Sequence, residues 1–218
     1  MAVSLLSVVF AGCKPDEPEV KRKAVSKLSE DSRYRLALVS EARDELDDWF
    51  EFYGLEEDAD TLFRLREIWD TDELAFPASA NWQQLYKEHD ELFLKSPDET
   101  KVLDIYTYNH EFTKKSRRRV TVKTINRDSE VATINPETGE KVRLMYCADA
   151  CQFEMAWWRN NDEIIVVGLI QETGKSEFYP ALWHINTYTN HIRQYTSLKP
   201  AKPAKKGYYL QDEVFYEL

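Results

Sequence analysis

Cysteine is the residue type in this sequence whose spacing most directly suggests chemistry. The chain of 218 residues has 3 cysteines, and two of them, Cys147 and Cys151, are separated by Ala-Asp-Ala. Both adjoin apolar, strand-like stretches, so we expect them to face each other across a turn, where Cα atoms lie about 5.5 Å apart and a disulfide can form. A metal site is not expected, because it would need a second pair of ligands, and His184 and His191 do not obviously converge on these thiols. A redox-active pair is possible, but it usually has Cys-x-x-Cys spacing. In an exported protein the pair predicts a disulfide.

The third cysteine, Cys13, ends an apolar segment at the amino terminus. Residues 1–12 carry no charge, and Lys-Pro-Asp-Glu-Pro-Glu follows the cysteine. A dozen apolar residues are too few to span a bilayer, and this length is typical of a signal sequence. The alternative is an amino-terminal strand or helix with a buried cysteine.

The tetrapeptide Phe10-Ala11-Gly12-Cys13 resembles the lipobox of bacterial lipoproteins. In that family the chain is cut before the cysteine, and the thiol receives a diacylglyceride. The resemblance implies that Cys13 is lipidated, with palmitate-like acyl chains as a membrane anchor. Lys14, where an Asp would retain the protein at the inner membrane, implies an outer-membrane lipoprotein facing the periplasm. Two features depart from the family: Phe10 replaces the usual Leu, and no basic residue precedes Cys13, which a start codon upstream of Met1 would explain.

The next segment predicts a tether between this anchor and a folded domain. Residues 13–28 are charged and contain Pro15 and Pro18, which favours a flexible linker. We therefore divide the chain into a lipoprotein signal at 1–12, a tether at 13–28 and a single α+β domain at 29–218.

Residues 29–96 are expected to form helices. Apolar residues between Val39 and Tyr53 recur on one helical face, and Gly54 is expected to end that helix. A shorter helix is expected over Leu62, Leu65 and Trp69, and a third over Trp82, Leu85, Tyr86, His89, Leu92 and Phe93.

Residues 100–218 are expected to form strands. Four β-branched or aromatic stretches between Cys151 and Thr196 are separated by Asn/Asp-rich turns. Two turn sequences also align at an offset of 51 residues, Ile134 to Gly139 with Ile185 to Asn190. Each ends in a residue that tolerates the left-handed conformation.

Residues 120–197 resemble blades of WD40-like β-propellers. Two such units cannot close a propeller, which needs at least four blades. We therefore interpret the likeness as a local meander, and we expect an α+β fold in which amino-terminal helices pack on one twisted antiparallel β-meander sheet.

Charged residues are unevenly distributed. Residues 30–73 hold 16 acidic and 5 basic residues, and 101–127 hold 8 basic and 2 acidic residues. The i,i+4 pairs Asp44/Asp48 and Asp47/Glu51 could bind a metal or act in acid–base catalysis, but without a histidine at ligand spacing a solvated helix face is the simpler interpretation.

Two further polar features invite a functional interpretation. His89 lies on an apolar stripe, which indicates a structural histidine more than a ligand. The basic run from Lys114 to Arg119 could bind phosphate groups, acidic lipids or an acidic protein, and we expect it to be the surface of a hairpin.

Exposed aromatic residues in the strands are the candidate binding contacts. Trp157, Trp158, Trp183 and Tyr188 would contact a partner if they lie at the surface, although such residues usually pack in the core. The structure decides between the two.

Four catalytic or nucleotide-binding motifs are absent from the sequence: Gly-x-Ser-x-Gly, a Walker loop, Gly-x-Gly-x-x-Gly and His-Glu-x-x-His. An enzyme that uses a pair of carboxylates stays an alternative, because such sites leave little trace in one sequence. The net charge of −10 argues against nucleic-acid binding. We expect a non-enzymatic envelope lipoprotein, without a cofactor or metal, that binds a protein or another envelope component. The alternative is an inhibitor or immunity-type protein whose acidic helices neutralise a basic enzyme.

Overall fold

A computed structural model describes residues 30–55, 62–77, 82–116, 119–202, 209–210 and 215. The signal-like segment, Cys13 and the tether lie outside the described residues, as do Arg117 and Arg118 of the basic run.

The described amino-terminal part begins with two consecutive helices, α1 (Glu30–Glu45) and α2 (Asp47–Phe52). Leu46 separates them because its backbone leaves the helical region, with φ −134°. Gly54 follows α2 with a positive φ of 65°, as expected for the residue that ends this helix. Further along the chain, helix α4 (Trp82–Glu88) precedes the 3-10 turn η1 (Asp90–Leu92).

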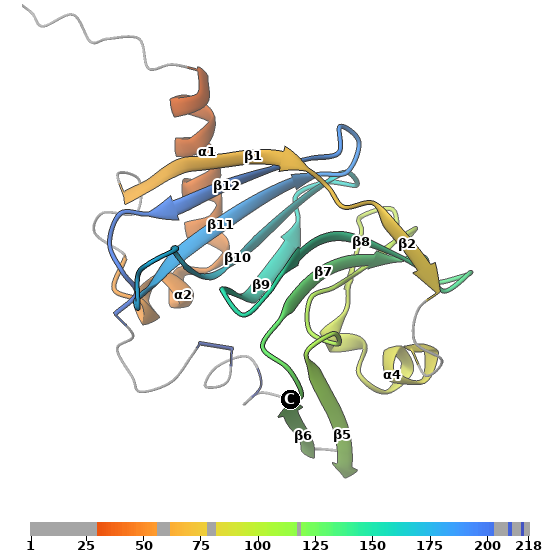
Figure 1. Cartoon of the computed structure of the whole chain (residues 1–218). Coiled ribbons are helices and arrows are strands. Elements are labelled where there is room, and N and C mark those ends of the chain that lie inside the picture. The colour runs from red at the N-terminus through yellow and green to blue at the C-terminus, as the bar shows by residue number, and fades with distance from the viewer. Residues whose placement is uncertain are drawn as a thin grey trace, which may run out of the picture.

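Most of the remaining structure is antiparallel β-sheet, in two five-stranded sheets and a separate hairpin (Figure 1). The first sheet has the strand order β1 (Phe63–Asp70), β12 (His191–Ser197), β11 (Phe178–Asn186), β10 (Glu163–Gln171) and β9 (Cys151–Trp158). The second has the order β2 (Leu74–Pro77), β8 (Glu140–Cys147), β7 (Ser129–Ile134), β4 (Val102–Asp104) and β3 (Leu94–Lys95). The hairpin joins β5 (His110–Ser116) to β6 (Arg119–Thr124).

The expectation of a single sheet was therefore wrong, and so was the helix expected around Leu62, Leu65 and Trp69. Leu62 immediately precedes β1, and Leu65 and Trp69 lie within this strand, which pairs with β12. A β-bulge lies between Leu65 and Glu67, so Leu65 pairs with Tyr195, and Trp69, on the opposite face, pairs with Ile192. The extra residue of the bulge breaks the alternation of a strand, and the apolar spacing then imitates a helix.

The turns that link the strands follow the sequence expectation. Asn135 and Asn186 each accept backbone N–H bonds from the second and third residues after them. Each of these turns ends in a left-handed residue, Gly139 with φ 72° and Asn190 with φ 57°. Strands β9 to β12 form a four-stranded antiparallel meander, whereas the likeness to propeller blades stays a prediction.

Two apolar clusters form the core. One contains residues of the second sheet together with the face of the first sheet that carries Trp183 and Ile192. The other contains residues of α1 and α2 together with the opposite face of β10 and β11, including Ile165 and Leu182. The fully buried Glu154 accepts hydrogen bonds from Trp49 and Tyr53 of the α2 region, so one carboxylate links the helix to β9.

Candidate ligand-binding site

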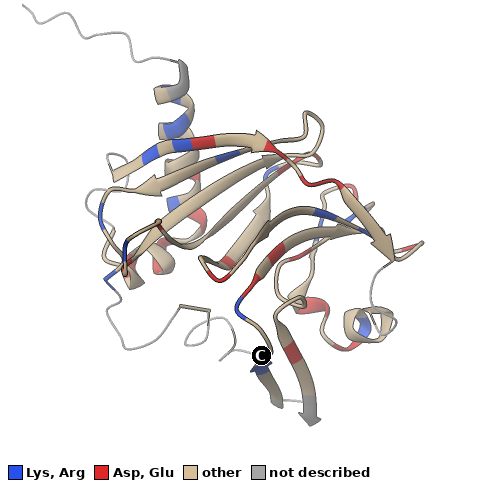
Figure 2. Cartoon of the chain, in the orientation of Figure 1, with Lys and Arg blue, Asp and Glu red and all other residues tan. Residues whose placement is uncertain are grey.

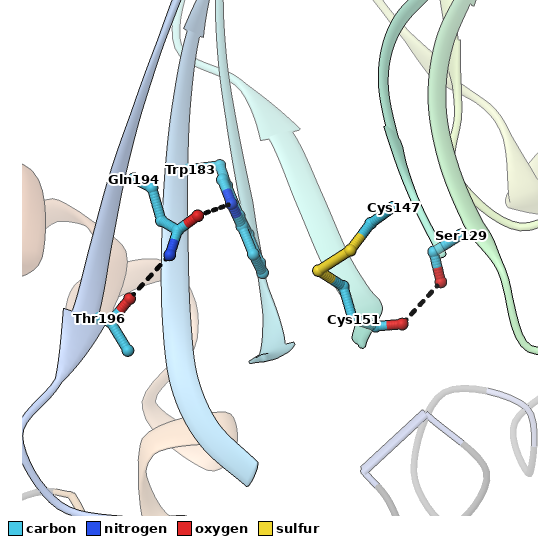
Figure 3. The surroundings of a disulfide bond; sticks show 6 residues. All are labelled: Ser129, Cys147, Cys151, Trp183, Gln194 and Thr196. Carbon is cyan, nitrogen blue, oxygen red and sulfur yellow. Dashed lines mark hydrogen bonds between the residues drawn. A yellow bond between two sulfur atoms is a disulfide. The ribbon is translucent and has the colours of Figure 1, made fainter. Parts of the chain in front are cut away.

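The disulfide expected from the cysteine spacing is present between Cys147 and Cys151, whose Cα atoms are 5.7 Å apart. It joins the end of β8 to the start of β9, and thus fixes the point where the chain passes from the second sheet to the first. Figure 3 shows Ser129 of β7 donating to the carbonyl of Cys151 at 3.3 Å. The bridge is therefore a structural connection between the sheets.

The four aromatic residues proposed as contacts do not form one surface. Trp183 is only 1% exposed, packs edge-on against Phe153 and donates to Gln194 at 3.3 Å (Figure 3), so it is a core residue and not a contact. Trp157 and Trp158 are half-buried, and the indole of Trp158 donates to the carbonyl of Leu94.

Tyr188 alone among these four aromatics is well exposed, at 83%, on the turn between β11 and β12. The aromatic set therefore offers one exposed contact and not an extended surface.

The polar residues singled out in the sequence also have separate roles. His89 is buried, with its ring 3.3 Å from Glu91, in keeping with a structural histidine. His184 is buried beneath Tyr34 of α1, and burial holds its pKa well below its usual range.

Charges of both signs follow each other along α1 (Figure 2). The acidic residues around the α1–α2 junction are exposed: Asp44, Glu45, Asp47, Asp48 and Glu51.

A largely buried cluster of interacting charges lies in the second sheet. Lys141 of β8 places its ammonium 3.2 Å from Asp104 Oδ2 and 2.6 Å from Glu130 Oε1. The guanidinium of Arg143, two residues further along β8, lies 2.6 Å from the other oxygen of Glu130. All four side chains are less than a quarter exposed. We call these four residues the ion network.

The strand pairing explains why the charges meet. In the register of β7 and β8, Lys141 pairs with Ile134 and Arg143 with Ala132, and β4 pairs with β7 on its other side. Asp104 stands at the end of β4, where its carboxylate also accepts hydrogen bonds from the backbone of Tyr106 and Thr107 and from the Thr107 hydroxyl. The Asp104 carboxylate is thus fixed by several donors, whereas Glu130 accepts a hydrogen bond from Arg143 and is otherwise held by its ion pair with Lys141.

Aromatic side chains stand around the ion network. A cavity of about 340 Å³ is lined by three of the charged residues and by aromatic and apolar groups that include Phe76, Trp82, Phe93 and Tyr108. Trp82 comes from α4, and its indole lies against Gly139, where an added Cβ would come within 2.8 Å of Nε1. The left-handed turn at Gly139 thus has a second role, because it leaves room for the tryptophan that lines the cavity.

Arg143 is held among aromatic rings beside this cavity. Its guanidinium carbon lies 5.5 Å from the centre of Phe76, 5.6 Å from Tyr108 and 5.0 Å from Tyr146. These distances are within the range of cation–π attraction, so the arginine orders the rings and at the same time neutralises Glu130.

The electrostatics of the ion network favour binding over covalent catalysis. Burial by itself would lower the pKa of Lys141, but the adjacent Asp104 and Glu130 carboxylates outweigh it and raise that pKa. The amine is therefore protonated at neutral pH and is not a nucleophile. An ammonium has three N–H donors; one is donated to Asp104 and the ammonium also forms an ion pair with Glu130, which leaves a donor for a ligand.

The ion network was missed in the sequence because its members stand in three separate strands. One signal was available: Asp104 directly follows two apolar residues and Glu130 precedes the apolar Val131 and Ala132, and a charge in a buried strand requires a partner. Which cation would pair with them depends on the sheet order, which the sequence does not specify.

No protein-family model, curated protein or solved structure matches the chain. Among the described residues, no group of three His, Cys, Asp or Glu is arranged to hold a metal ion. None of the helices in the described part combines the length and apolar character needed to cross a bilayer.

Proposed function

We propose that this protein is a lipid-anchored envelope protein, held at the outer membrane through Cys13, that binds a neutral saccharide of the envelope. The observation that carries the proposal is the aromatic-lined cavity next to an ion network whose charges cancel one another. Ligand pockets of this size combine apolar walls with a few fixed polar groups.

The chemistry of the cavity supports a saccharide. Aromatic rings suit the C–H faces of a sugar ring, while the ammonium of Lys141 offers a donor to its hydroxyl oxygens. Two acids and two bases give the ion network no net charge, so nothing in it favours a charged ligand. A neutral, hydroxyl-rich ligand meets both conditions.

The anchor and the tether would place the saccharide-binding domain at the membrane. The acyl chains on Cys13 would hold the domain at the membrane, and residues 13–28 would allow it to reach envelope material. In this proposal α1 and α2 form a layer over the first sheet, which leaves the cavity in the second sheet accessible.

Binding of neutral oligosaccharides, measured by calorimetry, tests the proposal. A chito-oligosaccharide and a malto-oligosaccharide serve as probes of stated chemistry. Replacing Tyr108 with Ala is expected to weaken binding about fivefold, because one stacking contact is worth roughly 1 kcal/mol. Tyr188→Ala makes the same change at an exposed position that does not line the cavity, and should leave affinity unchanged.

Two results would contradict the saccharide proposal. One is equal binding by the Tyr108→Ala and Tyr188→Ala proteins. The other is the absence of binding to any neutral glycan, including glycan strands released from the envelope of the host.

A second candidate function rests on the exposed acidic residues at the α1–α2 junction, which could steer a basic enzyme to an inhibitory protein. Such a partner would be captured at a rate that falls steeply with salt. Saccharide binding to a neutral site should be nearly independent of salt, so the salt dependence of association separates the two functions.

A further inference from the structure

A second cavity, of about 400 Å³, lies beside the disulfide. It shares no lining residue with the cavity beside the ion network, which we propose to bind a saccharide. Its inner part includes Asn109, His110 and Cys151, which are all buried. Arg127 and Asp149, which also line it, are exposed and form its outer part.

Asn109, which lines this cavity, has an unsatisfied acceptor. The residue is 6% exposed, and its side-chain oxygen Oδ1 is buried without a hydrogen-bond partner among the described residues. Buried side-chain acceptors are rarely left unpaired in native proteins, because the lost hydration is not recovered. A ligand that donates a hydrogen bond would satisfy this oxygen.

His110 supplies a second acceptor. Its Nδ1 lies 3.2 Å from the carbonyl oxygen of Tyr106, so Nδ1 carries the proton, since a carbonyl only accepts. Burial lowers the pKa of this imidazole, which is therefore neutral at pH 7 and has an unprotonated Nε2. Phe215 packs edge-on against the ring at 4.8 Å and fixes its position.

The outer part of the cavity carries one charge of each sign. Neither Arg127 nor Asp149 has an ion-pair partner in the part of the chain that the structure describes. A guanidinium binds a carboxylate, and a carboxylate binds an ammonium group. Together with the inner acceptors, this arrangement matches a ligand that has both groups.

We propose that this cavity binds a free amino acid or a short peptide with a free ammonium and a free carboxylate. The ammonium group would donate to Asn109 Oδ1 and pair with Asp149, and the carboxylate would pair with Arg127. This site does not depend on the proposed saccharide binding, because no residue is common to the two cavities.

Calorimetry of the full-length protein with alanyl-alanine tests the inference, with N-acetyl-alanyl-alanine and alanyl-alanine amide as matched probes. Each capped dipeptide lacks one charge and is expected to bind at least about tenfold more weakly. Asn109→Leu removes the acceptor at nearly constant volume and should weaken the dipeptide by a similar factor. Tyr188→Ala, at an exposed position that lines neither cavity, should leave it unchanged.

Two exposed substitutions, Arg127→Gln and Asp149→Asn, keep the test valid if Asn109→Leu does not fold. Arg127→Gln should abolish the preference for the free carboxylate, and Asp149→Asn the preference for the free ammonium group. The inference is overturned if alanyl-alanine does not bind at about 5 mM. It is also overturned if both capped dipeptides bind as well as the free one, or if neither exposed substitution changes the affinity.

Discussion

The buried carboxyl of Glu154 should make the stability of this protein depend on pH in a direction opposite to that of most acids. Glu154 is fully buried, Trp49 Nε1 donates to it at 2.9 Å and the Tyr53 hydroxyl at 2.8 Å. Burial raises its pKa from 4.5 to about 7, although these hydrogen bonds act in the opposite sense. The native protein therefore retains a proton that the unfolded chain releases between these two pH values.

The sign and the size of the effect follow from proton linkage. Because the native state binds more protons, the free energy of unfolding falls as the pH rises through this interval. A displacement from 4.5 to about 7 corresponds to about 3 kcal/mol in total, of which about 2.5 kcal/mol is lost between pH 5 and pH 8.

The assay is urea denaturation, followed by tryptophan fluorescence, of the wild type and Glu154→Gln at several pH values and constant ionic strength. The buried histidines His110 and His184 have lowered pKa values, so their contribution falls as the pH falls and opposes that of Glu154. Both proteins contain them, and the difference between the two curves isolates the carboxyl. That difference should change by about 2.5 kcal/mol between pH 5 and pH 8.

Glu137→Gln is the matched control, since it makes the same chemical change at an exposed position. Its stability curve should run parallel to that of the wild type. If the curve of Glu154→Gln is also parallel, the carboxyl does not carry the linkage and the reasoning is refuted.

Three further predictions concern the disulfide, the turn at Gly139 and the ion network. Reduction of Cys147–Cys151, or its replacement by serines, should lower the free energy of unfolding by about 2 kcal/mol, which is the chain-entropy estimate for so short a loop. Urea denaturation with and without reductant measures this change, and an unchanged midpoint would contradict the prediction. Gly139→Ala and Gly174→Ala both place an alanine at positive φ, and each should lower the free energy of unfolding by about 1–2 kcal/mol. Only the alanine at position 139 meets Trp82 of α4, so only Gly139→Ala should also weaken saccharide binding. Equal saccharide affinities of the two variants would refute that role of Gly139. Lys141→Met should lose about 3–5 kcal/mol, because it leaves Asp104 buried without a cation and Glu130 paired with Arg143 alone. A loss of free energy of unfolding below about 1 kcal/mol, measured by urea denaturation, would contradict this role of Lys141.

Local sequence patterns predicted the features that depend on a few neighbouring residues. The Cys147–Cys151 bridge depends only on spacing, and the left-handed turns at Gly139 and Asn190 only on residue type. The helix that ends at Gly54 follows from one apolar face, although Leu46 interrupts it.

Features that depend on sheet order could not be predicted in this way. The apolar spacing in β1 suggested a helix, and only the pairing with β12 reveals the bulge that produced it. Trp183 is of a residue type that is common in binding contacts, but its face of β11 packs in the core between the two sheets. The ion network required the order of β4, β7 and β8, because its four members come from these three strands.

The measurement that tests the central claim most directly is the intact mass of the protein isolated from the membranes of its host, with and without reductant. The account predicts a chain cut before Cys13, carrying acyl chains, that gains two protons when Cys147–Cys151 is reduced. An uncleaved chain with three free thiols would contradict export, and with it the placement of the binding site in the cell envelope.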